Sequence, residues 1–268
     1  MNIYCLLLII VYFCRDLQQN IAYEYCNDED DSETAVCPQG STHVICDPEQ
    51  VIKLGDVVGV VPMTEKLKKL YLDLHNEYRN DIACGKIVKD SKNFSKATRM
   101  RMLIWDDELA YIAQVHAERC NMAHDVCRNK QNHKMCGQNL AYTKSSEKKP
   151  LLPLSDLFVT MWFDEYKLVT DVDGFAKLFP EAQLMEVGHF TGMVNDRISR
   201  VGCAMTLCER PGDDLYHYHA TCDYDYTNAL GAMVYDGGDV GAKCSDWGTS
   251  LSSEYECLCE NSGELFEN

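Results

Sequence analysis

The chain has 268 residues, which is enough to bury one large hydrophobic core or two small ones. It carries 15 cysteines, a number that is typical of exported, disulfide-bonded proteins rather than of intracellular enzymes. The net charge of −17 argues against a nucleic-acid ligand, since phosphates attract Lys and Arg, and against docking on an anionic membrane surface.

The N-terminus carries an almost unbroken apolar run over residues 3–13, and charge begins at Arg15. A run of this length is too short to span a membrane and is typical of the hydrophobic segment of a signal peptide. The alternative, a buried N-terminal helix or strand, is disfavoured because a polar stretch follows at once. We therefore expect a signal peptide over residues 1–22, cleaved between residues 14 and 22, and a secreted, extracellular protein with no transmembrane segment.

An irregular arm over residues 23–62 comes next, with three cysteines and a turn at Pro38-Gln39-Gly40. Its last part, residues 51–61, is apolar enough either to line a groove for a lipid or to pack as part of the arm. Further along, Asn93-Phe94-Ser95 forms a glycosylation sequon at Asn93, which is consistent with export.

Three helices are predicted from apolar periodicity and capping residues. The first begins after Thr64 and ends near Gly85, and a lysine-rich loop then runs to about residue 101. The second begins at Asp106 or Asp107 and ends near Cys120. A loop with two prolines precedes the third, for which Ser155 is the expected N-cap and whose apolar face consists of Phe158, Met161, Trp162 and Tyr166.

The rest of the chain is interpreted as strands. Residues 200–209 and 215–224 flank Arg210-Pro211-Gly212-Asp213, and Pro-Gly is a strong turn signal, so we expect a hairpin. Cys203 and Cys222 are equidistant from the turn and should form a cross-strand disulfide, while Cys208 points to the other face. Helices followed by paired strands indicate an α+β fold.

Several short segments, in this order, resemble one family. They are the arm from Tyr25-Cys26 to Cys46, then Leu74-His75-Asn76-Glu77-Tyr78-Arg79, Cys120-Asn121-Met122-Ala123-His124, Gly137-Gln138-Asn139-Leu140-Ala141, Trp162-Phe163-Asp164-Glu165 and Gly188-His189-Phe190-Thr191. The chain is similar to the CAP superfamily of cysteine-rich secretory, antigen-five and pathogenesis-related proteins, and most of all to insect antigen-five venom or salivary allergens. The resemblance implies a three-layer α-β-α sandwich (CAP or SCP domain) over residues 63–232, with a C-terminal extension over residues 233–268.

The resemblance also implies a cleft with four polar residues, His124, Gln138, Glu165 and His189. Neutral imidazoles are good ligands for Zn or Cu, so His124 and His189 are candidate metal ligands, and Glu165 could complete or orient the site. Gln138 stands where many members carry Glu, which removes a negative charge beside the metal. The chain departs further from the usual signature at Gly192 and Asn195.

Structural roles are the alternative for each histidine. His124 lies between two cysteines and could simply pack there, and His189 could orient a turn. His217 and His219, two residues apart on a predicted strand, are a second candidate ligand pair. His75, Asn76 and Arg79 are assigned to helix packing and hydrogen bonding.

Removal of the signal peptide leaves 13 cysteines, so one thiol is free or bonds another chain. The resemblance implies the disulfides Cys26–Cys46, Cys37–Cys127 and Cys203–Cys222, and the tail suggests Cys244–Cys259. Five cysteines remain without an assigned partner, and Cys84 or Cys136 is the expected partner of Cys120. The remaining two are Cys208 and Cys257.

We expect a non-enzymatic, monomeric, secreted protein that binds a divalent metal, a partner protein or a small apolar ligand, in defence, venom or saliva. The alternative is a metal-dependent hydrolase or redox protein that uses the His/Glu cleft. The tail has too few cysteines for the channel-blocking module of some cysteine-rich secretory proteins.

Overall fold

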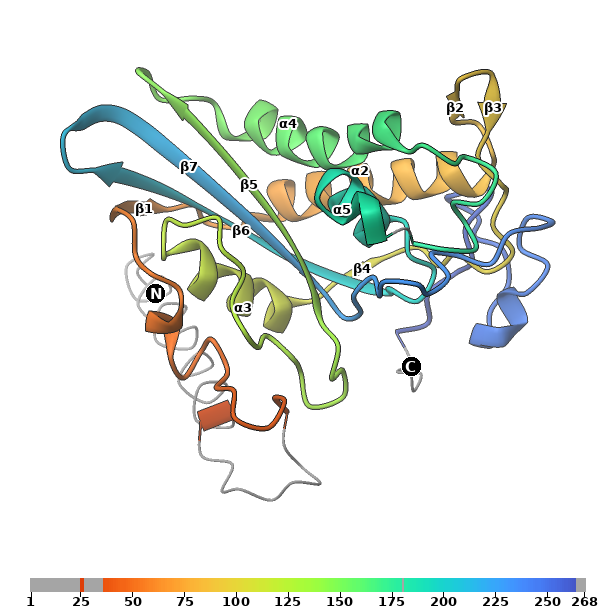
Figure 1. Ribbon diagram of the computed structural model, residues 1–268, viewed down its shortest axis with the longest axis horizontal. Helices are drawn as coiled ribbons and strands as arrows, with labels where there is room; N and C mark the ends of the chain where they lie inside the picture. The colour runs from red at the N-terminus through yellow and green to blue at the C-terminus, as the bar shows by residue number, and fades with distance from the viewer. Residues whose placement is uncertain (1–24, 27–35, 180, 264–268) are drawn as a thin grey trace, which may run out of the picture.

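The computed structural model describes residues 25–26, 36–179 and 181–263 of the chain (Figure 1). The expected signal peptide, residues 1–22, lies outside the described residues. Within them, no helix has the length and apolar character needed to cross a membrane.

The described residues form seven strands, two of which, β2 and β3, make a separate small hairpin. The strands are β1 (Asp56–Val60), β2 (Val88–Lys89), β3 (Lys92–Asn93), β4 (Ile104–Trp105), β5 (Gly137–Ser145), β6 (Arg200–Arg210) and β7 (Asp213–Tyr224). The α-helices are α2 (Glu65–Ala83), α3 (Asp107–Ala117), α4 (Leu151–Asp164) and α5 (Leu184–Met193). Short 3₁₀ helices are η1 (Pro48–Gln50), η2 (Glu165–Leu168), η3 (Glu181–Gln183) and η4 (Cys244–Trp247).

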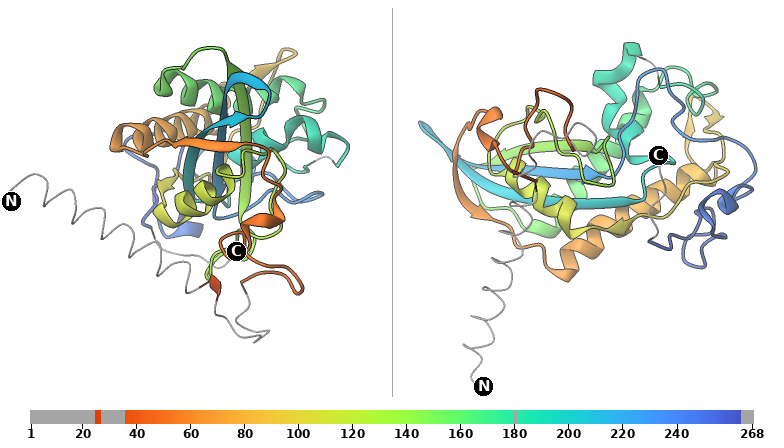
Figure 2. Two further views of the ribbon diagram at one scale, coloured as in Figure 1. Left: turned by 90° about the vertical axis from the view of Figure 1, so that its left-hand side faces the viewer. Right: turned by 90° about the horizontal axis from the view of Figure 1, so that it is seen from below.

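The main sheet lies between two helical layers. Its strand order is β1-β6-β7-β5, with antiparallel neighbours, and β4 runs parallel to β6. Helix α3 packs on one face against β6 and β7, and α2, α4 and α5 pack together on the other side (Figures 1 and 2). This arrangement confirms the predicted α+β, three-layer α-β-α sandwich.

The first two helices begin where their capping residues predict. The Thr64 side chain accepts a hydrogen bond from the backbone N–H of Leu67 at the start of α2. The Asp106 carboxylate accepts from the N–H groups of Glu108 and Leu109 at the start of α3. Each cap satisfies backbone donors that have no partner within the helix.

The buried polar residues of α2 tie the helix to its surroundings. Arg79 has no exposed surface, and its guanidinium donates to the carbonyl oxygens of Arg101, Met193 and Asn195 at 2.7–3.1 Å. Asn76 exchanges two hydrogen bonds with the backbone of Leu103. The packing role predicted for these signature residues is therefore correct.

Helix α4 begins one turn earlier than predicted, at Leu151. Pro150 occupies its N-cap position, and Ser155 is fully buried inside the helix rather than at its start. Pro153 lies in the first turn, where a residue without an N–H forfeits no intrahelical bond. The two prolines therefore belong to a helix start and not to a loop.

Helix α5 and strand β5 are the two longest elements that were not predicted. Residues 184–193 form α5 and not a strand, although the segment contains Gly188 and Gly192. Its helix is supported by packing, since Phe190 is fully buried against other aromatic rings of the core, which are Phe94, Phe163, Tyr166 and Phe175. Strand β5 is stabilised by a continuous antiparallel ladder with β7 that local sequence patterns do not reveal.

The predicted hairpin is present as β6 and β7. Cys203 and Cys222 are directly paired in the register and form the expected disulfide. Cys26–Cys46, Cys37–Cys127 and Cys244–Cys259 are also present as expected.

The prediction that Cys120 bonds Cys84 or Cys136 was wrong. Cys120 bonds Cys208, which points away from the Cys203 face and toward the end of α3. Cys84 bonds Cys257 and so ties the C-terminal segment to the end of α2. Cys136 is the free cysteine among the described residues, and it is buried. Sequence could not assign these pairs, because each joins segments whose relative placement depends on the whole fold.

The apolar stretch 51–61 contains the edge strand β1. Val51 and Val61 are buried, while Ile52, Val58 and Val60 between them are exposed. Strand β1 pairs with β6 along one edge of the sheet. The stretch is therefore part of the sheet, with Val51 and Val61 buried at its two ends.

Candidate functional site

The first half of the predicted cleft lies where the segment after α3 meets β5. His124 is in this segment, between Cys120 and Cys127, both of which are in disulfides. Its Nδ1 atom is 2.8 Å from Oε1 of Gln138 in β5. The residue reaches the surface, but burial around its ring lowers the pKa of His124, an effect that the hydrogen bond to Gln138 opposes. The imidazole is therefore neutral near pH 7.

The second half is a His/Glu pair contributed by α5 and η2. His189 Nδ1 lies 2.6 Å from Oε1 of Glu165, and the other carboxylate oxygen of Glu165 accepts from the backbone N–H of Phe190 at 3.0 Å. The indole of Trp162 stacks with the His189 ring, with a centroid separation of 6.3 Å. Both oxygens of Glu165 are thus engaged in orienting α5 and its histidine.

Edge strand β5 joins the two halves. The side chain of Gln138 reaches His124, and the side chain of the next residue, Asn139, donates to the backbone oxygen of His189 at 3.1 Å. Successive strand residues point to opposite faces, so one dipeptide holds a histidine on each side of the sheet edge. The two imidazoles are close enough that charge on His189 lowers the pKa of His124. The structure therefore brings all four predicted cleft residues into one region.

Two carboxyl groups behind Gln138 were missed by sequence reasoning. Gln138 Nε2 donates to Oδ2 of Asp125 at 2.8 Å and to Oδ1 of Asp223 at 3.0 Å. Burial, together with the charge of Asp125, raises the pKa of Asp223 well above its usual range, against the opposing effect of Arg128. Asp223 faces Gln138 in the β5–β7 register, so a prediction of β5 would have located it.

Two imidazoles are donors of the kind that Zn²⁺ and Cu²⁺ prefer. Each histidine uses Nδ1 in a hydrogen bond to an oxygen acceptor, and within the described part of the chain Nε2 has no hydrogen-bond partner, which is the usual arrangement of a metal-ligating histidine and its orienting partner. Among the described residues, the one group of three potential ligand atoms within 4.8 Å of each other is at Cys84, Glu256 and Cys257, and both of these cysteines are in a disulfide. The four predicted cleft residues do not form such a group, so a metal here would have His124 and His189 as its protein ligands.

The second candidate ligand pair, His217 and His219, is buried in the interior. His217 and His219 are each 1% exposed on β7. The ring nitrogens of His217 already contact the Tyr142 hydroxyl at 2.7 Å and a carboxylate oxygen of Asp213 at 3.1 Å. His217 is thus engaged within the protein, whereas the two cleft histidines are more accessible.

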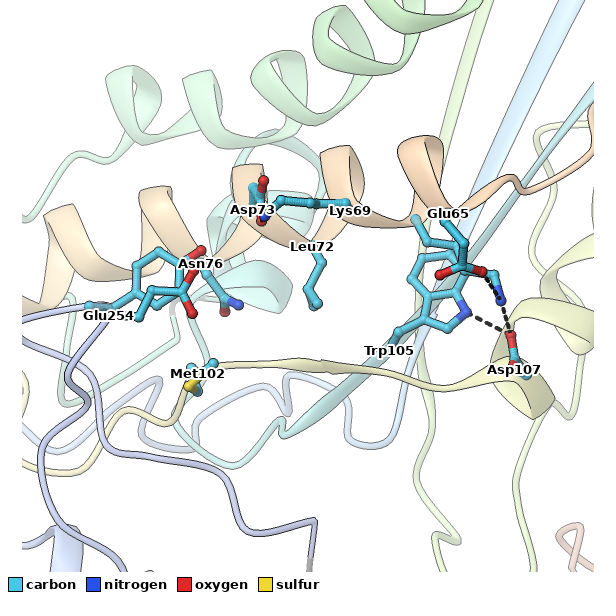
Figure 3. Close-up of a pocket in the computed structure, with 11 residues that line it drawn as sticks. Glu65, Lys69, Leu72, Asp73, Asn76, Met102, Trp105, Asp107 and Glu254 are labelled. Carbon is cyan, nitrogen blue, oxygen red and sulfur yellow. Dashed lines mark hydrogen bonds and ion pairs between the residues drawn. The ribbon is translucent and has the colours of Figure 1, made fainter.

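Two grooves lie elsewhere on the surface. One, of about 500 Å³, lies between α2 and the segment that carries Met102 and Trp105 (Figure 3). At one end of it, Asp107 pairs with Lys68 at 2.7 Å and accepts from the Trp105 indole at 2.9 Å. The other groove, of about 430 Å³, lies between α2 and α4 and has a largely apolar lining that includes Leu70, Leu152 and Pro153.

Comparison with known proteins identifies the family. The model of the CAP family, described as the cysteine-rich secretory protein family, matches residues 72–224. The chain belongs to this family. The chain is 35% identical over 239 residues to Venom allergen-1 of Aedes albopictus, with coverage of 85% of this chain and 86% of the relative. It is also 42% identical to Antigen 5 like allergen Cul n 1 of Culicoides nubeculosus over 146 residues, which are 54% of this chain and 64% of the relative.

Solved structures show the same fold. The crystal structure of NaASP2 with Zn²⁺ has a TM-score of 0.60 at 21% identity and covers 83% of this chain and 99% of its own. The structure of BmVAL-1 has a TM-score of 0.63 at 21% identity and covers 75% of this CAP protein and 97% of its own chain. The predicted resemblance to CAP proteins of the antigen-five type is confirmed.

The predicted glycosylation site is accessible. Asn93 lies in β3 and is exposed, and its side chain donates to the backbone oxygen of Gly85. Carbohydrate at Asn93 remains a prediction.

Proposed function

We propose that this CAP protein is secreted and acts without turnover, by binding a divalent metal such as Zn²⁺ or Cu²⁺ between His124 and His189. The observation that carries the proposal is that both Nδ1 atoms are held by oxygen acceptors, which leaves both Nε2 atoms for coordination. The lowered pKa of His124 keeps its imidazole neutral and ready to coordinate near pH 7. Six disulfides among the described residues support export to an oxidising compartment.

Binding is favoured over catalysis for two reasons. Gln138 cannot act as a general base, and Glu165 already accepts from His189 and from a backbone N–H. The hydroxyl beside His189 is not activated by it either: Thr191 is fully buried, donates to the Gly188 oxygen and accepts from Asn228. A bound metal would supply Lewis acidity at an open position, which keeps a metal-dependent hydrolase or redox protein as the alternative.

Calorimetric titration with Zn²⁺ and with Cu²⁺ tests the proposal on protein purified from secreting cells. We expect saturable binding of one ion that is lost in the His124→Ala/His189→Ala double variant. His217→Gln is the control, because it alters the second candidate ligand pair and should leave binding unchanged. Binding that survives the double variant, or that is lost in the control alone, would contradict the proposal. Turnover that needs both the metal and the two histidines would favour the enzyme alternative.

A small apolar ligand is the second candidate. The groove between α2 and α4 supports it, because Leu70, Leu152 and Pro153 line it. Organic extraction of the purified protein, followed by mass spectrometry, should release a lipid that is reduced in a Leu152→Asp variant. An extract without any lipid, from a protein that also fails to take up fatty acid or sterol in a binding assay, would contradict this candidate.

A further inference from the structure

The orientation of the Gln138 amide is fixed by its neighbours. A carboxamide has an oxygen that only accepts and a nitrogen that only donates. Nε2 faces one oxygen of Asp125 and one of Asp223, whereas Oε1 faces Nδ1 of His124 at 2.8 Å. Rotating the amide by half a turn would place its oxygen against the Asp125 carboxylate, which is paired with Arg128 and can only accept, and would leave that hydrogen bond unmade. Because the acids hold Nε2 of Gln138, His124 faces the amide oxygen Oε1 and not the amide nitrogen.

Both acids are themselves held in place. Asp125 is 6% exposed and pairs with the Arg128 guanidinium, with Nε and Oδ1 3.0 Å apart. Asp223 is fully buried on β7, directly opposite Gln138 on β5. Asp125 lies in the irregular segment between α3 and β5 and is held there by its ion pair, whereas Asp223 is held by the strand register.

We propose that Asp125 and Asp223 are positioning residues, which act through Gln138 to hold His124 in the tautomer with hydrogen on Nδ1 and a lone pair on Nε2. Since Oε1 of Gln138 can only accept, Nδ1 must donate. His189 reaches the same tautomer more directly, because its Nδ1 faces Glu165. The two histidines are therefore prepared alike, one by a carboxylate and the other by an amide that two acids orient.

That the Nε2 lone pair of His124 coordinates a metal rests on the proposed function. That His124 carries its hydrogen on Nδ1 does not depend on metal binding. Gln138 carries no charge, and the negative charge behind it is that of Asp125, whose carboxylate accepts a hydrogen bond from the Gln138 amide. Partners of this kind contribute about 10- to 100-fold to metal affinity. Tautomer and affinity can thus be measured separately, and one can fail while the other holds.

The test is long-range ¹H–¹⁵N correlation NMR of the histidine rings in the metal-free protein, with chelator, at a pH where His124 is neutral. We expect His124 to carry its hydrogen on Nδ1 in the wild type. In Asp125→Leu/Asp223→Leu both acceptors are gone, so the form with hydrogen on Nε2 should become populated. Asp125→Asn/Asp223→Asn offers both a carbonyl oxygen and an NH2 group at each position, so we expect the form with hydrogen on Nε2 to be populated less than in the leucine variant but more than in the wild type. The His189 tautomer, which depends on Glu165, is the internal control in every sample.

A second variant covers the case in which the double leucine variant does not fold. Gln138→Met removes the amide and leaves both acids, and it too should release the Nδ1–H tautomer. Wild-type tautomer in folded Asp125→Leu/Asp223→Leu, or in Gln138→Met, would overturn the proposal. Zinc titration of the same variants then separates the two claims: an altered tautomer without any zinc binding in the wild type would contradict only the proposed function.

Discussion

The two sides of the central sheet are built with different chemistry. Alternate residues of β7 that face α2, α4 and α5 are mostly apolar or aromatic, namely Tyr218, Ala220, Cys222 and Tyr224. Those that face α3 are polar, namely His217, His219, Thr221 and Asp223. On β7, one side is thus lined by apolar groups and the other by directed polar contacts. The α3 side has in addition a small apolar cluster of Ala113, Ala117 and Ala204 and the disulfide Cys120–Cys208.

This difference places the candidate site. Strand β5 is the edge at which the two sides meet, and Gln138 and Asn139 reach toward opposite sides from it. His124 belongs to the polar side and His189 to a helix of the apolar side. An aromatic layer positions one histidine, and a network of hydrogen bonds positions the other.

The stability of the protein should be more sensitive to the loss of side-chain volume on the aromatic side of the sheet, which is the side that faces α2, α4 and α5. We expect Phe190→Ala to lower the free energy of unfolding by about 3–5 kcal/mol, because the ring is fully buried among other aromatic side chains. Leu157→Ala on the exposed face of α4 is the control and should change it by about 0.5 kcal/mol or less. Chemical denaturation gives both values. Equal effects of the two substitutions would show that the core does not depend on this packing.

The polar side should depend more on its cross-link. Cys120–Cys208 joins residues 88 apart, whereas Cys203–Cys222 on the aromatic side joins residues 19 apart. The chain-entropy model predicts that replacing the first pair by alanine costs about 1 kcal/mol more than replacing the second. Denaturant unfolding of the two double variants measures the difference. A larger loss for Cys203→Ala/Cys222→Ala would mean that the aromatic side is the one stabilised by its disulfide.

Acid should weaken the polar side through His219. Burial first, then the charges of Arg210, His217 and His116, lower the pKa of His219 to about 4, below the value of about 6.5 in an unfolded chain. Between these values the unfolded state binds more protons, so the stability that neutral His219 permits is lost as the pH falls from about 6.5 toward 4.

His219→Phe tests this dependence, since phenylalanine cannot be protonated. We expect the fall in unfolding free energy between pH 6.5 and 4 to be smaller in the variant, by up to about 3 kcal/mol. Thermal or chemical unfolding across this pH range gives the two profiles. Parallel profiles would exclude His219 as a source of acid sensitivity.

The sequence predicted those parts of the molecule that depend on local signals. Thr64 and Asp106 cap their helices as expected, and the Pro-Gly turn sets the register that pairs Cys203 with Cys222. The four cleft residues were found through resemblance to a family, and not through periodicity or spacing.

The parts that escaped prediction depend on distant partners. Helix α5 contains two glycines and is supported by aromatic packing, while β5 is defined by its ladder with β7. Without β5, nothing in the sequence connects Gln138 with Asp223, 85 residues away. The orienting acids of the site were missed for the same reason as the partner of Cys120: both depend on which segments the sheet and the layers bring together.

The most direct test of the metal-binding claim is anomalous diffraction at the zinc edge from crystals soaked in Zn²⁺. The account predicts a peak at bonding distance, about 2.0–2.1 Å, from Nε2 of both His124 and His189. Both Nδ1 atoms should keep their contacts with Gln138 and Glu165. Three results at saturating zinc would contradict the metal-binding claim: a peak bonded to Nδ1 of either histidine, a peak at His217, or no peak near His124 and His189.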